Sequence, residues 1–153
     1  MRWLELKIPP PVIGALVALA MWGVSTSVPG LNLAPALRVV CVTLLLVAGV
    51  CFDLLGLLAF VRARTTVNPL RPQRTRALVT GGVYRITRNP MYVGMALLLA
   101  AWAMHLDTAL AWPGPLVFML YITRFQIQPE ERILAGLFGE DYRAWCARVH
   151  RWL

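Results

Sequence analysis

Two short polar clusters interrupt an otherwise apolar chain, and their residue types suit the binding of a charged ligand. The first, GGVYRITRNPMYVG (residues 81–94), contains Arg85, Arg88 and two tyrosines, and the second contains Glu130 and Glu131. Guanidinium groups bind carboxylates and phosphates through paired hydrogen bonds, whereas carboxylates accept hydrogen bonds from ammonium or hydroxyl groups. Together the clusters could hold a ligand that carries both a positive and a negative charge.

The first cluster also has the backbone features of a ligand-binding turn. Gly81 and Gly82 permit positive φ and the close approach of a ligand. Pro90 suits the first turn of a helix, where free N–H groups and the helix dipole favour an anion. The structural alternative is that the arginines only orient a membrane protein, the tyrosines join an aromatic belt and the glutamates form salt bridges with Arg85 or Arg88.

Composition places the chain in a membrane. Of its 153 residues, 59% are hydrophobic and 14% are charged, whereas soluble domains carry about 25% charged residues. The formal net charge of +8 comes almost wholly from arginine, but no soluble basic domain is present to bind nucleic acid. We expect an all-α integral membrane bundle, a single domain over residues 1–153, with no nucleic-acid partner and no metal site.

A membrane-spanning helix needs about 20 apolar residues, and four stretches approach this length. The first could be a cleaved signal peptide, but its apolar core is long and no A-x-A site follows it, so we expect it to be retained. After Pro129 we expect a cytoplasmic amphipathic helix that is interrupted at Gly139 and lies at the membrane surface. The expected spans are residues 12–28, 39–61, 91–106 and 109–127.

Arginine placement predicts the orientation of these spans. Basic residues are concentrated before the first span, between the second and third, and after the fourth, whereas the other two connections hold only Arg38. By the positive-inside rule, both termini and the middle loop face the cytoplasm. The third and fourth spans then form a hairpin that brings Asn89 close to Glu130 and Glu131.

Asp53 lies inside the second expected span. Carboxylates within a membrane are rare and often functional. The alternative is that Asp53 pairs with Arg62 or another basic group near the end of the helix, and we favour this structural pairing.

The run LVTGGVYRITRNPMYVG, followed by PEERILAGLFGEDYRAW, resembles the isoprenylcysteine carboxyl methyltransferase family. The likeness covers roughly residues 61–152. That family is related to the phospholipid N-methyltransferases, and both are integral membrane enzymes that use S-adenosylmethionine and release S-adenosylhomocysteine. The segment TTVNP (residues 65–69) is similar to the bacterial branch, which implies a bacterial inner membrane. The resemblance implies methyl transfer to a lipophilic acceptor at the cytoplasmic leaflet.

The resemblance also implies that the methyl donor is held between residues 62–94 and 124–153. We expect Glu131 to orient or deprotonate the acceptor with the help of Arg88, while Glu130 holds the donor. The implied acceptor contacts are Arg85 and Gln126. The implied donor contacts are Arg76, Ala77, Leu78, Val79, Gly82, Tyr84, Asn89, Pro90, Met91, Tyr92 and Glu130.

Two positions depart from the family pattern. Asn89 stands where the family usually has His, so this position cannot carry a proton near neutral pH. Gln126 stands where the eukaryotic enzymes are expected to have an Arg that grips a substrate carboxylate, and Arg124 or Arg88 could replace that charge. Both a carboxylate acceptor and an amine acceptor stay open, and an amine would need a base. The rival class is a non-catalytic membrane scaffold or small transporter, which would not bind the donor.

Overall fold

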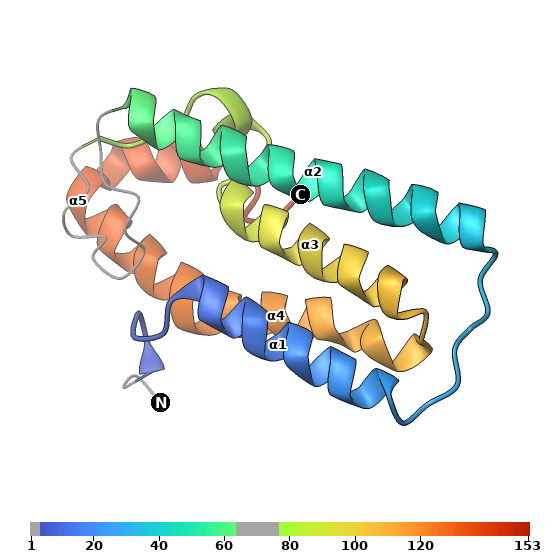
Figure 1. The fold of residues 1–153 in the computed structure, drawn as a ribbon. Helices are drawn as coiled ribbons and strands as arrows, with labels where there is room; N and C mark the ends of the chain where they lie inside the picture. The colour runs from blue at the N-terminus through green and yellow to red at the C-terminus, as the bar shows by residue number, and fades with distance from the viewer. Residues whose placement is uncertain (1–3, 64–76) are drawn as a thin grey trace.

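The described part of the chain, residues 4–63 and 77–153 of a computed structural model, contains helices and no strands (Figure 1). Five α-helices form the body of the structure: α1 Pro10–Ser25, α2 Pro35–Arg62, α3 Pro90–Leu106, α4 Pro113–Ile122 and α5 Gln128–Cys146. Three short elements connect them: the 3-10 helices η3 Gly82–Arg85 and η4 Ala109–Ala111, and the π-helix η5 Thr123–Ile127.

Proline sets where these helices begin, because its fixed φ and missing N–H are tolerated in the first helical turn. All five α-helices carry a proline at one of their first two positions. The expected spans at residues 12–28, 39–61 and 91–106 correspond to α1, α2 and α3, with α1 ending at Ser25. The expected fourth span at 109–127 is divided among η4, α4 and η5.

Helix α2 is the element best suited to cross a membrane. Within the described residues it alone is long and apolar enough by length and composition, with 28 residues, while α1 and α3 are shorter apolar helices. Leucine and valine side chains of α2, among them Leu44 and Leu54, are exposed. An outward apolar surface of this kind fits a lipid environment better than water.

Helices α2 and α3 approach each other closely because small residues line their contact. A Cβ added to Gly94 of α3 would lie 2.2 Å from Asp53 Oδ1, and one added to Gly56 of α2 would lie 2.8 Å from Met91 Cγ. Asp53 Oδ1 is buried and has no hydrogen-bond partner in the described chain. The expected pairing of Asp53 with Arg62 is therefore not observed, because the carboxylate packs against α3 instead of reaching the helix end.

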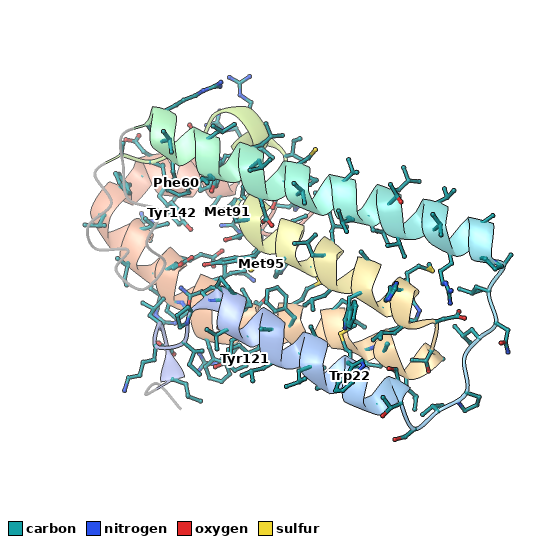
Figure 2. All side chains as sticks on the ribbon, viewed as in Figure 1. Trp22, Phe60, Met91, Met95, Tyr121 and Tyr142 are labelled. Atoms are coloured by element: carbon teal, nitrogen blue, oxygen red, sulfur yellow. The ribbon has the colours of Figure 1, made fainter. Side chains whose placement is uncertain are left out.

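Two apolar clusters hold the helices together. One joins α1, α3 and α4 and contains Ile13, Leu99 and Phe118. The other contains Tyr84, Tyr142 and Trp145, where the second half of α5 folds back against η3 and the end of α2. Figure 1 shows this return of α5 beside α2, and Figure 2 shows Phe60, Met91 and Tyr142 near the same end of the bundle.

The return of α5 depends on a kink at Gly139, where the sequence predicts an interruption. Gly139 has φ 52° and ψ −121°, values outside the helical region. A positive φ of this kind is readily adopted only by glycine. The kink places the end of the chain over the region where α3 begins.

Candidate functional site

A half-buried carboxylate, that of Glu130, joins the first turn of α3 to the first turn of α5. The hydroxyl of Tyr92 donates a hydrogen bond of 3.0 Å to Glu130 Oε1, and Gln126 Nε2 donates one of 2.8 Å to the same oxygen. Tyr92 is 7% exposed and Gln126 is 2% exposed. The structure thus brings together three residues that the sequence assigns to donor and acceptor contacts.

Burial gives Glu130 unusual acid–base properties. Loss of solvation raises the pKa of Glu130 from 4.5 to about 7, although the hydrogen bonds from Gln126 and Tyr92 act in the opposite direction. The pKa of Tyr84 is also raised, first by burial and then by the nearby charge of Glu130. A carboxyl group with a pKa near neutrality can both accept and release a proton at physiological pH.

Glu131 has a different environment, because two arginines bind it. Arg88 Nη1 lies 3.2 Å from Glu131 Oε1. Arg151 donates through Nε at 3.0 Å to Oε1 and through Nη2 at 2.7 Å to Oε2. Both carboxylate oxygens of Glu131, the residue expected to orient or deprotonate the acceptor, thus have guanidinium partners.

Arg88 has further contacts that fix its position. Its Nη1 also donates to Cys146 Sγ at 2.6 Å. Its backbone N–H donates to the carbonyl oxygen of His150 at 2.9 Å. Arg88 Nε is buried and has no hydrogen-bond partner among the described residues, so it is a donor that a ligand could satisfy.

The segment after α5 is tied to the residues that precede α3. Asn89 Nδ2 donates to the carbonyl oxygen of Arg151 at 2.9 Å, and Thr87 Oγ1 donates to the same oxygen at 3.2 Å. Thr87 Oγ1 also accepts the backbone N–H of Asn89 at 3.2 Å. The side chain expected to contact the donor at position 89 is therefore used to hold the end of the chain in place.

Aromatic rings cover the turn that leads into this region. The ring centroid of Tyr84 lies 5.6 Å from that of Phe60 and 6.5 Å from that of Trp145. Trp145 Nε1 donates to the carbonyl oxygen of Tyr84 at 3.3 Å. Of the two expected turn glycines only Gly82 has positive φ, at 60°, whereas Gly81 is extended.

Several of the remaining residues that the sequence assigns to the site line two separate grooves. An apolar groove of about 490 Å³ lies between the end of α2 and residues 78–83, and Leu78, Val79 and Gly82 line it. A second groove of about 520 Å³ is lined by Arg88 and Glu131, with Arg132, Tyr142 and Arg151. Both volumes lie in the range of small-molecule sites.

The other assigned residues lie outside these contacts. Ala77 is half-buried and Arg85 is exposed. Pro90 is buried and Met91 packs against Gly56. Arg76 lies outside the described residues.

The arginines proposed to replace a substrate-gripping charge at position 126 already have partners. Arg124 Nη1 lies 2.9 Å from Glu5 Oε1, and Arg88 pairs with Glu131. Glu5 also pairs with Arg132. No spacing pattern points to the partners Glu5 and Arg151, because each lies far along the chain from the residues that it binds.

Comparison with known proteins places this site in a described family. The family model for phospholipid methyltransferase matches residues 37–141. An uncharacterized protein of Haemophilus influenzae is 44% identical over 63 residues, which are 41% of this chain and 100% of that protein. No solved structure matches the chain.

Plant proteins are also similar to the chain. A probable protein-S-isoprenylcysteine O-methyltransferase of Oryza sativa subsp. indica is 32% identical over 93 residues, 58% of this chain and 47% of that protein. Protein-S-isoprenylcysteine O-methyltransferase B of Arabidopsis thaliana is 32% identical over 92 residues, 58% of this chain and 45% of that protein. The chain thus spans about half the length of these plant relatives.

Proposed function

Because the chain belongs to the phospholipid methyltransferase family, whose model matches more than half of it, we propose that it is a membrane methyltransferase that depends on S-adenosylmethionine. The acceptor is a lipophilic amine, methylated at the cytoplasmic leaflet. The observation that carries the proposal is the buried cluster in which Tyr92 and Gln126 both donate to Glu130.

The donor set around this cluster suits S-adenosylmethionine, a zwitterion joined to a sulfonium and an adenosine. Both hydrogen bonds to Glu130 described above are accepted by Oε1, so Oε2 can accept from an ammonium or a ribose hydroxyl of a ligand. Arg88 Nε, which has no partner among the described residues, can donate to a carboxylate. The face of Tyr84 can favour a cation. When bound, the cofactor supplies a methyl group that the sulfonium has already activated.

The choice of an amine acceptor rests on charge. In the described part of the chain, Arg124 and Arg132 are each paired with Glu5, which leaves them poorly suited to grip a substrate carboxylate, and the free Nε of Arg88 is already assigned to the carboxylate of the donor. Glu130, in contrast, has a pKa of about 7. An ammonium acceptor can lose one proton to ionised Glu130, and its nitrogen lone pair would then form the bond to the methyl carbon while the carbon–sulfur bond of the donor would break and leave its electron pair on sulfur.

The proposal reassigns the expected roles of the two glutamates. Glu130 becomes the residue that moves a proton, as well as a contact for the donor. Glu131 becomes a positioning residue, because its bonds to Arg88 and Arg151 connect the entrance of α3 to the end of the chain. The protein's remaining task is to orient the reactants and exclude water from them.

The membrane placement is part of the proposal. Helices α1, α2 and α3 and the continuous run from α4 through η5 would form four spans, with both termini on the cytoplasmic side of a bacterial inner membrane. In support, the backbone N–H of Leu6 donates to Phe125 O and Trp152 Nε1 donates to Thr123 Oγ1. The segments before α1 and after α5 therefore meet at one end of the bundle, the end that contains the site.

A transfer assay tests the proposed reaction. The full chain in lipid nanodiscs would be given methyl-labelled S-adenosylmethionine and either phosphatidylethanolamine or a soluble S-prenylated cysteine. We expect label on the amine lipid. Label on the prenylated cysteine alone would overturn the amine assignment, and label on neither, without binding of S-adenosylhomocysteine, would support a scaffold or transporter instead.

A further inference from the structure

The π-helix η5 follows from the proline that comes just after it. In an α-helix the carbonyl of Phe125 would accept the N–H of the residue four positions later, and that residue is Pro129. Proline has no N–H, and its ring also clashes with the carbonyl four residues earlier. The carbonyl of Phe125 therefore needs another donor, and the helix widens over Thr123–Ile127.

The segment before α1 supplies that donor. The backbone N–H of Leu6 donates a hydrogen bond of 3.0 Å to the Phe125 carbonyl oxygen. Leu6 has φ 57°, a left-handed conformation that is unfavourable for a residue with a side chain. A strained conformation of this kind persists only where surrounding contacts enforce it.

Glu5 provides contacts that enforce this conformation, because its carboxylate binds one arginine of η5 and one of α5. Its Oε1 accepts from Arg124 inside η5 at 2.9 Å, and its Oε2 accepts from Arg132 in α5. Both carboxylate oxygens are thus used, and the Glu5 side chain is only 13% exposed. One side chain thus bridges Arg124, two residues before Gln126, and Arg132, two residues after Glu130.

The end of the chain holds the first residue of η5. Trp152 Nε1 donates to Thr123 Oγ1 at 3.1 Å, and Thr123 Oγ1 donates to the Met119 carbonyl oxygen at 2.7 Å. The segments before α1 and after α5 therefore both form hydrogen bonds with the same π-helical turn. This turn carries Gln126, which donates to Glu130.

We propose that Glu5 is a positioning residue of the site, which holds the π-helical turn so that Gln126 and Glu130 keep their hydrogen-bonded geometry. One residue corresponds to about 100° of rotation around a helix. If the turn tightened by one residue, Glu130 would rotate by that angle relative to the buried face of α4. This positioning role goes beyond the proposed function, because only one of its two tests measures methyl transfer.

Hydrogen exchange of the full chain in nanodiscs, without any cofactor, tests the structural half of the proposal. In Glu5→Gln, we expect the amides between residues 123 and 131 to exchange about two- to fivefold faster than in wild type. This range corresponds to the loss of the small stabilisation that ion pairs with exposed arginines provide. The matched control is Glu140→Gln, which breaks the exposed Glu140–Arg143 pair. Glu5→Asp keeps the charge and should restore slower exchange. Equal exchange in Glu5→Gln and Glu140→Gln would overturn the proposal.

The pH dependence of methyl transfer tests the functional half. The hydrogen bond from Gln126 lowers the pKa of Glu130, so its loss should move the acidic limb of the pH–rate profile to higher pH. We expect this displacement in Glu5→Gln and not in Glu140→Gln. An unmoved limb in Glu5→Gln would refute a positioning role. Failure of the methyltransferase proposal gives a different result, because wild-type protein would then show no transfer at any pH while the exchange test still applies.

Discussion

Replacing Glu130 by glutamine should make the protein more stable at alkaline pH while it removes activity. A pKa raised from 4.5 to about 7 means that folding disfavours the ionised carboxylate by about 3 kcal/mol. This penalty is absent below pH 4.5, grows as the pH rises and is complete above pH 7. Glutamine has a similar shape and no charge, so the variant does not carry the penalty.

Thermal unfolding in nanodiscs at pH 5 and at pH 8 measures this effect. Wild type and Glu130→Gln should melt at similar temperatures at pH 5, and the variant should melt higher at pH 8. Methyl transfer in the variant should fall by about 10²–10⁴-fold, the usual contribution of a general base. A variant that melts lower than wild type at pH 8 would show that the ionised carboxylate stabilises the fold, which contradicts the reasoning from burial. Undiminished transfer would refute the role of Glu130 as a base.

Further predictions concern the two glutamates and the helix contact. Glu131→Gln should lower the melting temperature, because Arg88 loses its ion-pair partner. The acidic limb of the pH–rate profile should stay in place in this variant. A displaced limb would instead identify Glu131 as the base. Gly94→Ala should destabilise the protein by about 1–3 kcal/mol, because its Cβ would meet Asp53 Oδ1 at 2.2 Å. Gly136→Ala is the control in thermal unfolding, since a Cβ there meets nothing within 4 Å, and equal losses in both variants would contradict the packing argument.

Local sequence signals predicted the helices where they determine the backbone directly. Helix α3 spans Pro90–Leu106, close to the expected 91–106, and Asp107 directly after it has a left-handed φ of 55°. The kink at Gly139 was also predicted, because glycine adopts positive φ without strain. The approach of Glu130 and Glu131 to the start of α3 followed from the expected hairpin.

The π-helix was missed although its signal was present. Pro129 does lie in the first turn of α5, as interpreted from the sequence, but α4, η5 and α5 run on without a break, so a proline of this kind can mark either a separate helix or a widened turn. Distinguishing the two requires knowing that the N–H of Leu6 reaches Phe125. A contact between residues so far apart in sequence has no local pattern.

The roles of the two glutamates could not be assigned from sequence for a similar reason. Glu130 and Glu131 are adjacent residues of the same type, and only their tertiary contacts distinguish them. Arg151 reaches Glu131 because the chain folds back at Gly139, and Glu130 accepts a hydrogen bond from buried Tyr92. The difference between their surroundings thus arises from packing and not from residue type.

Calorimetric titration of the full chain in nanodiscs with S-adenosylhomocysteine measures whether the cluster around Glu130 holds the methyl donor. We expect saturable binding to wild type, and binding that is lost or greatly weakened in Glu130→Gln but retained in Glu140→Gln. Absence of binding to wild type, or equal binding to Glu130→Gln, would contradict the claim that this buried carboxylate cluster holds the methyl donor.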